Sequence, residues 1–126
     1  MAAESNLKSV LIVDDEEAIL FAFKDILSGP EVLVDTAQSI DEARSCMLRG
    51  KYNGAIIDLR LSGTDSAEGF ELIRLAKQHN PHCIVLLLTA YAGPGTREEG
   101  FSRGADLFLE KPVSPDVVCE ALQSRW

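Results

Sequence analysis

The sequence predicts a single α/β domain, a (βα)5 arrangement in which five strands alternate with five helices around a parallel sheet. The chain has 126 residues, which is enough for one hydrophobic core and too few for two. Short apolar runs alternate with longer amphipathic segments, and this alternation favours a parallel sheet with helices on both faces. One run, 83–90, is apolar from Cys83 to Leu88, as expected for a strand that is buried on both faces.

Five apolar runs predict the strands. They cover residues 9–13, 31–37, 54–59, 83–90 and 106–112. Segment 31–37 alternates more between apolar and polar residues than the others do. We therefore expect this strand to lie nearer an edge of the sheet.

The first two predicted helices carry clear signals. In segment 16–29, four apolar side chains fall on one helical face: Ile19, Phe23, Ile26 and Leu27. A Gly-Pro pair then ends the helix. Segment 39–50 opens with Ser39 and has Glu42 three residues later, which is a capping-box pattern.

The last three predicted helices follow the strands in the same way. Segment 67–80 ends before a proline. Segment 95–104 has glycines at both ends and one inside, so we expect a weak helix there. Segment 114–126 begins with Ser114 as the N-cap residue and Pro115 in the first turn.

Composition excludes several classes of function. The net charge of −8 argues against direct nucleic-acid binding and against binding to anionic membranes. The cysteines lack metal-site spacing, so we expect reduced thiols and a cytoplasmic setting. There is no signal peptide pattern, and no apolar run is long enough to span a bilayer. We expect residues 1–7 to be a tail, and the 126 residues to be one domain, either a whole small protein or part of a longer one.

Residues of complementary chemistry follow four of the predicted strands. Asp14 and Asp15 follow the first, Asp58 ends the third, Thr89 ends the fourth and Lys111 ends the fifth. Ligands of an open parallel sheet bind at the carboxyl ends of its strands. We therefore expect three carboxylates, one hydroxyl and one ammonium group to share one edge of the sheet.

Such a cluster predicts a cation site. Two carboxylates about 4 Å apart repel by roughly 4 kcal/mol at an effective dielectric constant near 20. A single lysine offsets only part of this repulsion. Carboxylate oxygens suit Mg²⁺, which keeps several of its waters. Mg²⁺ beside a lysine and a hydroxyl group predicts a site for a phosphoryl group.

Each of these residues also has an ordinary structural explanation. Asp14 and Asp15 can cap the helix that follows them, where the helix dipole favours negative charge. Asp58 can be a turn residue, and Thr89 an ordinary residue at a strand end. Lys111 can be a solvated lysine. Their joint occurrence favours the functional interpretation.

Four motifs in order carry a resemblance to a known family. They are VDDEE after the first strand, IIDLRL at the third, LLTA at the fourth and FLEKP at the fifth. The sequence resembles the receiver domain of bacterial two-component response regulators, from about Lys8 to the end of the chain. The resemblance implies a doubly wound sheet with the flavodoxin-like strand order 2-1-3-4-5.

The resemblance also implies roles for the site residues. Asp58 is expected to be the phosphoacceptor, which attacks the phosphohistidine of a sensor histidine kinase or phosphotransfer protein. Asp14, Asp15, Asp58 and the backbone carbonyl of Arg60 are expected to bind Mg²⁺. Lys111 is expected to pair with Asp58 and then with the phosphoryl group. The protein would not be a turnover enzyme, because it would catalyse only its own phosphorylation and dephosphorylation.

Other positions are expected to transmit or tune the signal. Thr89 would bind the phosphoryl group, and Phe108 stands where the family has its switch aromatic, which turns inward as the threonine moves. The output would pass to a downstream protein or a fused effector domain. Arg60 and Tyr91 are large, and we expect them to hinder water and lengthen the life of the acyl phosphate. The loop 62–68 is longer than is usual in the family, and its role is open.

Three other functions remain as alternatives. A Mg²⁺-dependent phosphatase of the haloacid-dehalogenase type needs an Asp-x-Asp motif after the first strand, whereas Asp14 and Asp15 are adjacent. A flavodoxin-like FMN binder needs a phosphate loop there, and the acidic DDEE run would repel phosphate. A pseudo-receiver would bind partners without being phosphorylated, but the acidic pair, the acceptor and Lys111 are all present.

Overall fold

The computed structural model describes residues 7–58, 67–90 and 95–126, and it contains the predicted parallel sheet. The strands are β1 (Lys8–Val13), β2 (Val32–Ala37), β3 (Gly54–Asp58), β4 (Ile84–Thr89) and β5 (Leu107–Glu110). They lie in the order β2-β1-β3-β4-β5, and each neighbouring pair is parallel. The (βα)5 class, the order 2-1-3-4-5 and the edge position of the strand predicted at 31–37 are therefore confirmed.

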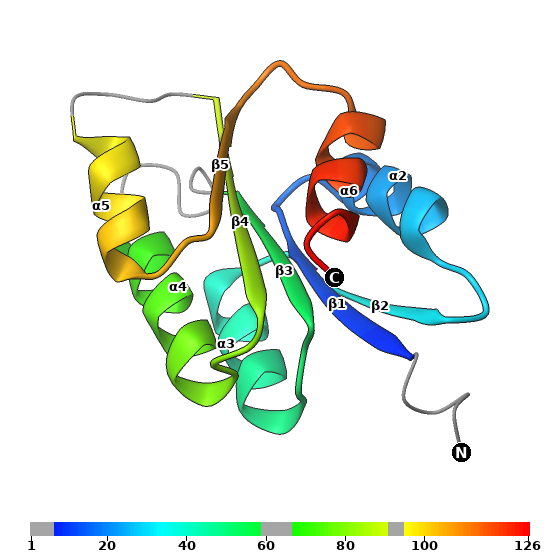
Figure 1. The fold of residues 1–126 in the computed structure, drawn as a ribbon, viewed down its shortest axis with the longest axis horizontal. Helices are drawn as coiled ribbons and strands as arrows, with labels where there is room; N and C mark the ends of the chain where they lie inside the picture. Colours follow the sequence, from blue (N-terminus) through cyan, green and yellow to red (C-terminus); the bar gives the residue numbers. More distant parts are fainter. Residues whose placement is uncertain (1–6, 59–66, 91–94) are drawn as a thin grey trace.

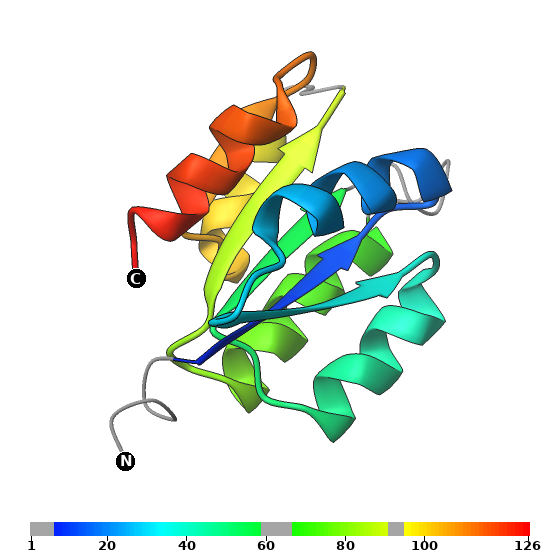
Figure 2. The same ribbon diagram turned by 90° about the vertical axis from the view of Figure 1, so that its right-hand side faces the viewer.

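Helices cover both faces of this sheet. They are α2 (Glu17–Leu27), α3 (Ile40–Arg49), α4 (Ala67–His79), α5 (Thr96–Arg103) and α6 (Pro115–Gln123). Figures 1 and 2 show α2 and α6 on one face and α3, α4 and α5 on the other. None of the described helices combines the length and the apolar character that a membrane span requires.

The core consists of two apolar layers, one on each side of the sheet. In β1, Val10 and Ile12 pack with α2 and α6, whereas Leu11 and Val13 pack with α3 and α4. This division follows from the strand geometry, because successive side chains point to opposite faces. β4 is buried from Val85 to its end, as expected for a strand with helices on both sides.

The buried face of α2 differs from the predicted one. The structure buries Leu20, Phe23 and Leu27. Ile26 is 40% exposed, although the sequence placed it on the apolar face. The buried side chains are spaced i, i+3 and i+7, and this stripe turns the neighbouring Ile26 toward solvent.

The predicted helix caps are present, with one difference in detail. Ser39 Oγ accepts a hydrogen bond from Glu42 N at 3.1 Å, and Ser114 Oγ accepts one from Val117 N at 3.3 Å. Glu42 reaches back to the backbone N–H of Gln38 rather than to that of Ser39. The start of α3 is therefore held by a variant of the predicted capping box.

Candidate functional site

The sheet register brings the predicted site residues to one level. Val13 is the register partner of Ile57, so Asp14 follows β1 at the level of Asp58, the last residue of β3. β1 and β3 are neighbours in space but not in sequence, and the helices that follow them, α2 and α4, cover opposite faces of the sheet. This is the switch point at which ligands of doubly wound sheets bind.

Lys111 joins the two buried carboxylates. Its Nζ donates to Asp58 Oδ2 at 2.5 Å and lies 3.6 Å from Asp14 Oδ2. Both carboxylate side chains are 2% exposed, and that of Lys111 is 18% exposed. Charge-assisted hydrogen bonds of this kind are short and strong, particularly where water is excluded.

The backbone fixes Lys111 beside Thr89. Glu110 of β5 is the register partner of Thr89, and Lys111 N donates to Thr89 O at 2.7 Å. The Thr89 side chain is buried, with the residue 1% exposed. The peptide bond between Lys111 and Pro112 is cis. The predicted hydroxyl, ammonium and two of the predicted carboxylates therefore lie at the same edge of the sheet.

Asp14 has two different oxygen environments. Its Oδ1 accepts the backbone N–H of Glu16 at 2.9 Å, and Glu16 is itself the N-cap residue of α2. This oxygen therefore stabilises the turn that leads into α2 and does not cap the helix, so the capping interpretation of Asp14 is wrong. Its buried Oδ2 accepts no hydrogen bond from the part of the chain that the structure describes. The pKa of Asp14 is raised to about 6, chiefly by burial and also by the neighbouring Asp58, while the Glu16 N–H and Lys111 partly offset this rise.

Asp14, Asp15 and Glu16 form a carboxylate cluster. One ligand oxygen from each lies within 4.8 Å of the others, with Asp14 buried and the other two exposed. The residues present fit a hard divalent cation, because the cluster is made of carboxylate oxygens and Asp14 has a buried oxygen, Oδ2, that accepts no hydrogen bond from the described residues. The resemblance predicted this role for Asp15 but not for Glu16.

Other predicted site positions are only partly described. Arg60, Tyr91 and most of the loop 62–68 lie outside the described residues, so their predicted roles remain predictions.

Phe108 lies in β5, half-buried against the core layer that faces α3 and α4. Its ring faces Phe101 and Arg97 of α5, two neighbours that the sequence analysis missed. The spacing of four residues places Arg97 and Phe101 on one face of α5, but it does not show that this face meets Phe108.

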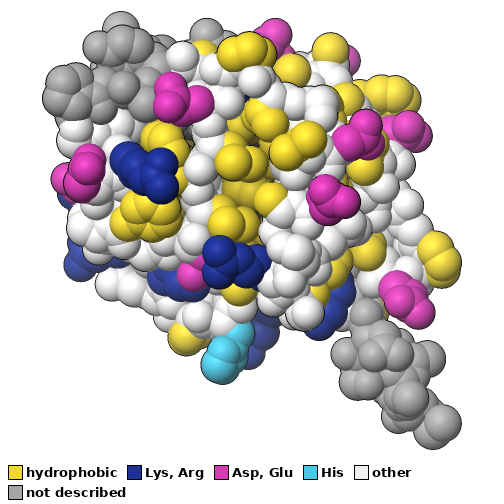
Figure 3. Space-filling view, turned by 45° about the horizontal axis from the view of Figure 1, so that its top comes forward, with side chains coloured by type: hydrophobic (Ala, Val, Ile, Leu, Met, Phe, Trp, Pro, Cys, Tyr) yellow, Lys and Arg dark blue, Asp and Glu magenta, His cyan; other side chains and the backbone are white. Residues whose placement is uncertain are grey.

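An apolar groove adjoins the site. Its volume is about 500 Å³. It is lined by Ile19, Phe23, Leu88, Ala90, Lys111, Pro112, Val113 and Pro115. Figure 3 looks partly onto this edge of the sheet and shows hydrophobic side chains gathered in the middle of the face, with acidic side chains around them. The groove therefore runs from the lysine of the site to the apolar side chains of α2.

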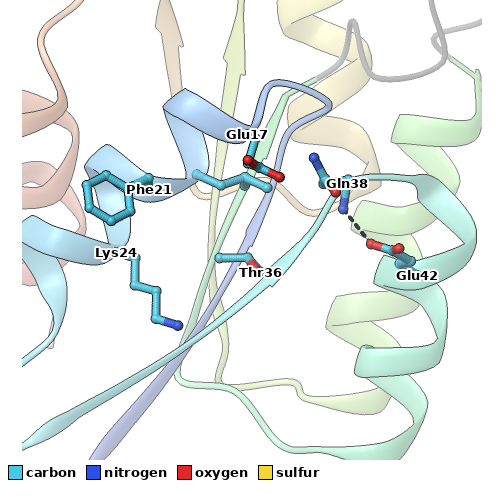
Figure 4. A pocket seen from close by; sticks show the side chains of 7 residues that line it. Glu17, Phe21, Lys24, Thr36, Gln38 and Glu42 are labelled. Carbon is cyan, nitrogen blue, oxygen red and sulfur yellow. Dashed lines mark hydrogen bonds between the residues drawn. The ribbon is translucent and has the colours of Figure 1, made fainter.

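Two further hollows lie outside the site. One, of about 230 Å³, lies between α2, β2 and the start of α3, where Glu17, Phe21 and Lys24 line it together with Glu42 (Figure 4). The other, of about 250 Å³, contains His79 and His82 in its lining. Both histidines are exposed, and neither belongs to the carboxylate cluster.

Comparison with protein families identifies this arrangement. Residues 10–123 match the family model described as the response regulator receiver domain. The chain belongs to the response regulator receiver family. A receiver domain is the phosphoacceptor unit of two-component signalling, so the motif-based resemblance is confirmed, and neither the phosphatase nor the pseudo-receiver alternative is favoured.

Curated relatives of this receiver domain are regulatory proteins. The transcriptional regulatory protein ResD of Bacillus subtilis is 33% identical over 115 residues, covering 91% of this chain and 46% of the relative. The alginate biosynthesis transcriptional regulatory protein AlgB of Pseudomonas syringae pv. tomato is 35% identical over 115 residues, covering 91% of this chain and 25% of the relative. The chain thus spans half or less of these two relatives.

Solved structures show the same receiver fold. A CheY-like receiver domain protein from Methanospirillum hungatei has a TM-score of 0.84 and 29% identity, covering 94% of this chain and 93% of that one. A response regulator protein from Burkholderia pseudomallei has a TM-score of 0.81 and 32% identity, covering 93% and 67%. The latter structure contains a phosphorylated aspartic acid and a calcium ion.

Proposed function

We propose that this receiver domain takes a phosphoryl group onto Asp58 from a sensor histidine kinase or a phosphotransfer protein. The observation that carries the proposal is the contact of Lys111 Nζ with Asp58 Oδ2, 3.6 Å from Asp14 Oδ2, at the carboxyl edge of the sheet. The phosphorylated aspartic acid in the Burkholderia pseudomallei relative supports an aspartate as the acceptor.

The proposed chemistry is nucleophilic attack by a carboxylate. An oxygen of Asp58 attacks the phosphorus of a phosphohistidine, and a P–O bond forms as the P–N bond breaks. The imidazole leaves with the electron pair of the broken bond. Lys111 offsets the negative charge on the phosphoryl oxygens, and Thr89 donates its hydroxyl hydrogen to one of them. Hydrolysis at the same site returns Asp58 and inorganic phosphate.

The proposed cofactor is Mg²⁺. Asp14, Asp15, Asp58 and the backbone carbonyl of Arg60 would hold it, and Glu16 belongs to the same carboxylate cluster as Asp14 and Asp15. Bound Mg²⁺ supplies positive charge to the phosphoryl oxygens. Asp14 contributes one oxygen to the turn that leads into α2 and keeps the other for the cation, which explains how one side chain serves both purposes.

The proposed signal leaves the site through Thr89 and Phe108. The two side chains lie on the same face of the sheet, because Phe108 is the register partner of Leu87 and Thr89 follows two residues later in β4. Movement of Thr89 toward a phosphoryl group would make room for the ring of Phe108. The output would pass to a downstream protein or to a fused effector region, since two relatives of greater length are transcriptional regulatory proteins.

The groove beside Lys111 supports a protein as the phosphoryl donor. A histidine on another protein has to reach Asp58, so its carrier must bind next to the site. Ile19 and Phe23 of α2 and the segment from Pro112 to Pro115 provide apolar surface there. The net charge of −8 and the acidic side chains around the groove favour a partner with a basic rim.

Three broader aspects belong to the same proposal. Residues 1–126 would form one receiver domain with residues 1–7 as a tail, acting in the cytoplasm. The thiols of Cys46, Cys83 and Cys119 are unpaired, which agrees with a reducing compartment. The acidic domain itself would bind neither nucleic acid nor membrane.

The test uses acetyl phosphate as a small phosphoryl donor and intact-mass measurement as the readout. With Mg²⁺ we expect one added phosphoryl group on the wild-type protein. EDTA or the variant Asp58→Asn should abolish the addition, whereas Asp41→Asn, a matched change at an exposed carboxylate in α3, should not. A mass unchanged in the wild type, or a modification that survives in Asp58→Asn, contradicts the proposal.

A further inference from the structure

Three side chains of α5 and β5 form a stacked group, the Arg97–Phe101–Phe108 cluster. The ring centroids of Phe101 and Phe108 are 6.4 Å apart, with a tilt of 45° between the ring planes. Arg97 Cζ lies 5.5 Å from the Phe101 centroid and 5.7 Å from the Phe108 centroid. All three distances are within the range of attractive aromatic and cation–π contacts. One guanidinium group therefore bridges a helix ring and a strand ring.

The close approach of α5 to the sheet makes this cluster possible. A Cβ atom on Gly100 would lie 2.6 Å from Leu87 Cδ2, so the helix approaches β4 more closely than a larger residue would allow. Arg97 and Phe101 are four residues apart and share one helical face. That face is next to Phe108, because Leu87 and Phe108 are register partners. The side of the molecule that carries α5 shows basic side chains against hydrophobic ones (Figure 3).

The cluster holds Phe108 at the outer margin of the core. The ring is half-buried, with Phe101 and Arg97 lying against it from α5. An inward turn of the ring toward Thr89 would move it away from both of these contacts. The contacts therefore stabilise the outward position of the Phe108 ring and not the inward one. This difference shifts the equilibrium between the two positions toward the outward one.

We propose that Arg97 is a positioning residue that holds Phe108 outward and so opposes the phosphorylated conformation of the domain. This inference rests on the switch role given to Phe108 in the proposed function. Coupling between two sites is reciprocal, so a contact that favours the outward ring must weaken binding of a phosphoryl group or its analogue at Asp58. Loss of the Arg97 side chain must strengthen that binding by the same factor.

The expected effect is modest and measurable. A cation–π contact at an exposed site shifts an equilibrium roughly two- to fivefold. Arg97→Ala and Arg97→Gln should therefore lower the midpoint of a beryllofluoride titration, performed with Mg²⁺, roughly two- to fivefold. Arg97→Lys keeps a cation over the rings and should restore a midpoint near that of the wild type.

The experiment uses the full chain labelled with para-fluorophenylalanine. Fluorine NMR follows the resonance of Phe108, assigned with Phe108→Leu, as beryllofluoride is added. Arg74→Ala is the matched control, because it removes the same charge from an exposed side chain of α4 that pairs with Glu71. Thermal melting of every variant verifies that it is folded.

The outcomes separate the inference from the proposed function. A lower midpoint in Arg97→Ala and Arg97→Gln, with rescue in Arg97→Lys and no change in Arg74→Ala, supports the inference. Equal midpoints in the wild type and Arg97→Ala overturn it, as does an equal shift in Arg74→Ala. If the Phe108 resonance of the wild type does not respond to beryllofluoride, the switch role is wrong and the inference falls with it, whereas phosphorylation of Asp58 is tested separately by mass.

Discussion

Replacing Asp14 with asparagine should stabilise the metal-free protein. The Asp14 side chain is 2% exposed, and burial is the main reason that its pKa is raised to about 6. A raised carboxyl pKa means that the folded chain favours the protonated, neutral form. Asparagine has nearly the same shape and is neutral at every pH. The variant should therefore keep the packing and lose the cost of a buried charge.

The size and sign of the effect follow from the two pKa values. Below both values Asp14 is protonated in the folded and unfolded chains, so it contributes no pH dependence. As the pH rises from the unfolded value of 3.8 to the folded value of about 6, the unfolded chain loses its proton first, and the wild-type protein loses stability. At one pKa unit per 1.36 kcal/mol, the loss is about 3 kcal/mol above pH 6.

The assay is urea unfolding in EDTA between about pH 4 and pH 8. The free energy of unfolding of Asp14→Asn relative to the wild type should grow by about 2 kcal/mol between pH 4 and pH 7 and then stay constant. Asp15→Asn is the matched control, because the same charge is removed from an exposed neighbour, and its stability difference should be within about 1 kcal/mol. A difference between Asp14→Asn and the wild type that does not vary with pH would refute the reasoning.

Addition of Mg²⁺ should reverse the advantage of the variant. A ligand that binds only the folded state stabilises it in proportion to the logarithm of its concentration over its dissociation constant. The wild type should therefore gain stability with Mg²⁺, whereas Asp14→Asn and Asp15→Asn should gain little. An equal gain in Asp14→Asn would remove this residue from the cation site.

Two further predictions concern the scaffold beneath the site. Gly104→Ala should destabilise the fold by about 1–3 kcal/mol in urea unfolding. Gly104 has φ 119°, and an added Cβ would lie 2.7 Å from Lys77 Cγ. An unchanged urea midpoint would contradict the assigned backbone conformation. Asp106→Ala should cost about 2 kcal/mol, since Asp106 Oδ2 accepts Lys77 Nζ at 3.0 Å and a backbone N–H of β4 at 2.8 Å. Asp106→Asn keeps a hydrogen-bond acceptor and should therefore lose less stability than Asp106→Ala. Equal losses of stability in the two variants would show that hydrogen bonding is not the cause.

The fold and most of the site edge follow from local patterns in the sequence. Alternating apolar runs and amphipathic segments determine a parallel sheet, and the carboxyl ends of parallel strands meet at one edge. Asp58, Thr89 and Lys111 could therefore be assigned to one site before any distance was known. The strand order came from the resemblance, because apolar patterning does not specify which strands are neighbours.

Other features depend on tertiary geometry that the sequence does not encode locally. Adjacent residues point in different directions, and the pattern alone does not say that Asp14 is buried while Asp15 is exposed. The contact of Arg97 with Phe108 joins a helix to a strand, so no local period reveals it. The position of Ile26 depends on how α2 rotates on the sheet, and the helical pattern allowed more than one rotation.

The central claim is that Asp58 is the residue that carries the phosphoryl group. Borohydride reduces an acyl phosphate of aspartate to homoserine, so peptide mass spectrometry after treatment with acetyl phosphate, Mg²⁺ and borohydride identifies the acceptor directly. The account predicts homoserine at position 58 and at no other aspartate, and its absence from a sample kept in EDTA. Homoserine at position 14 or 15, or at no position, would contradict it.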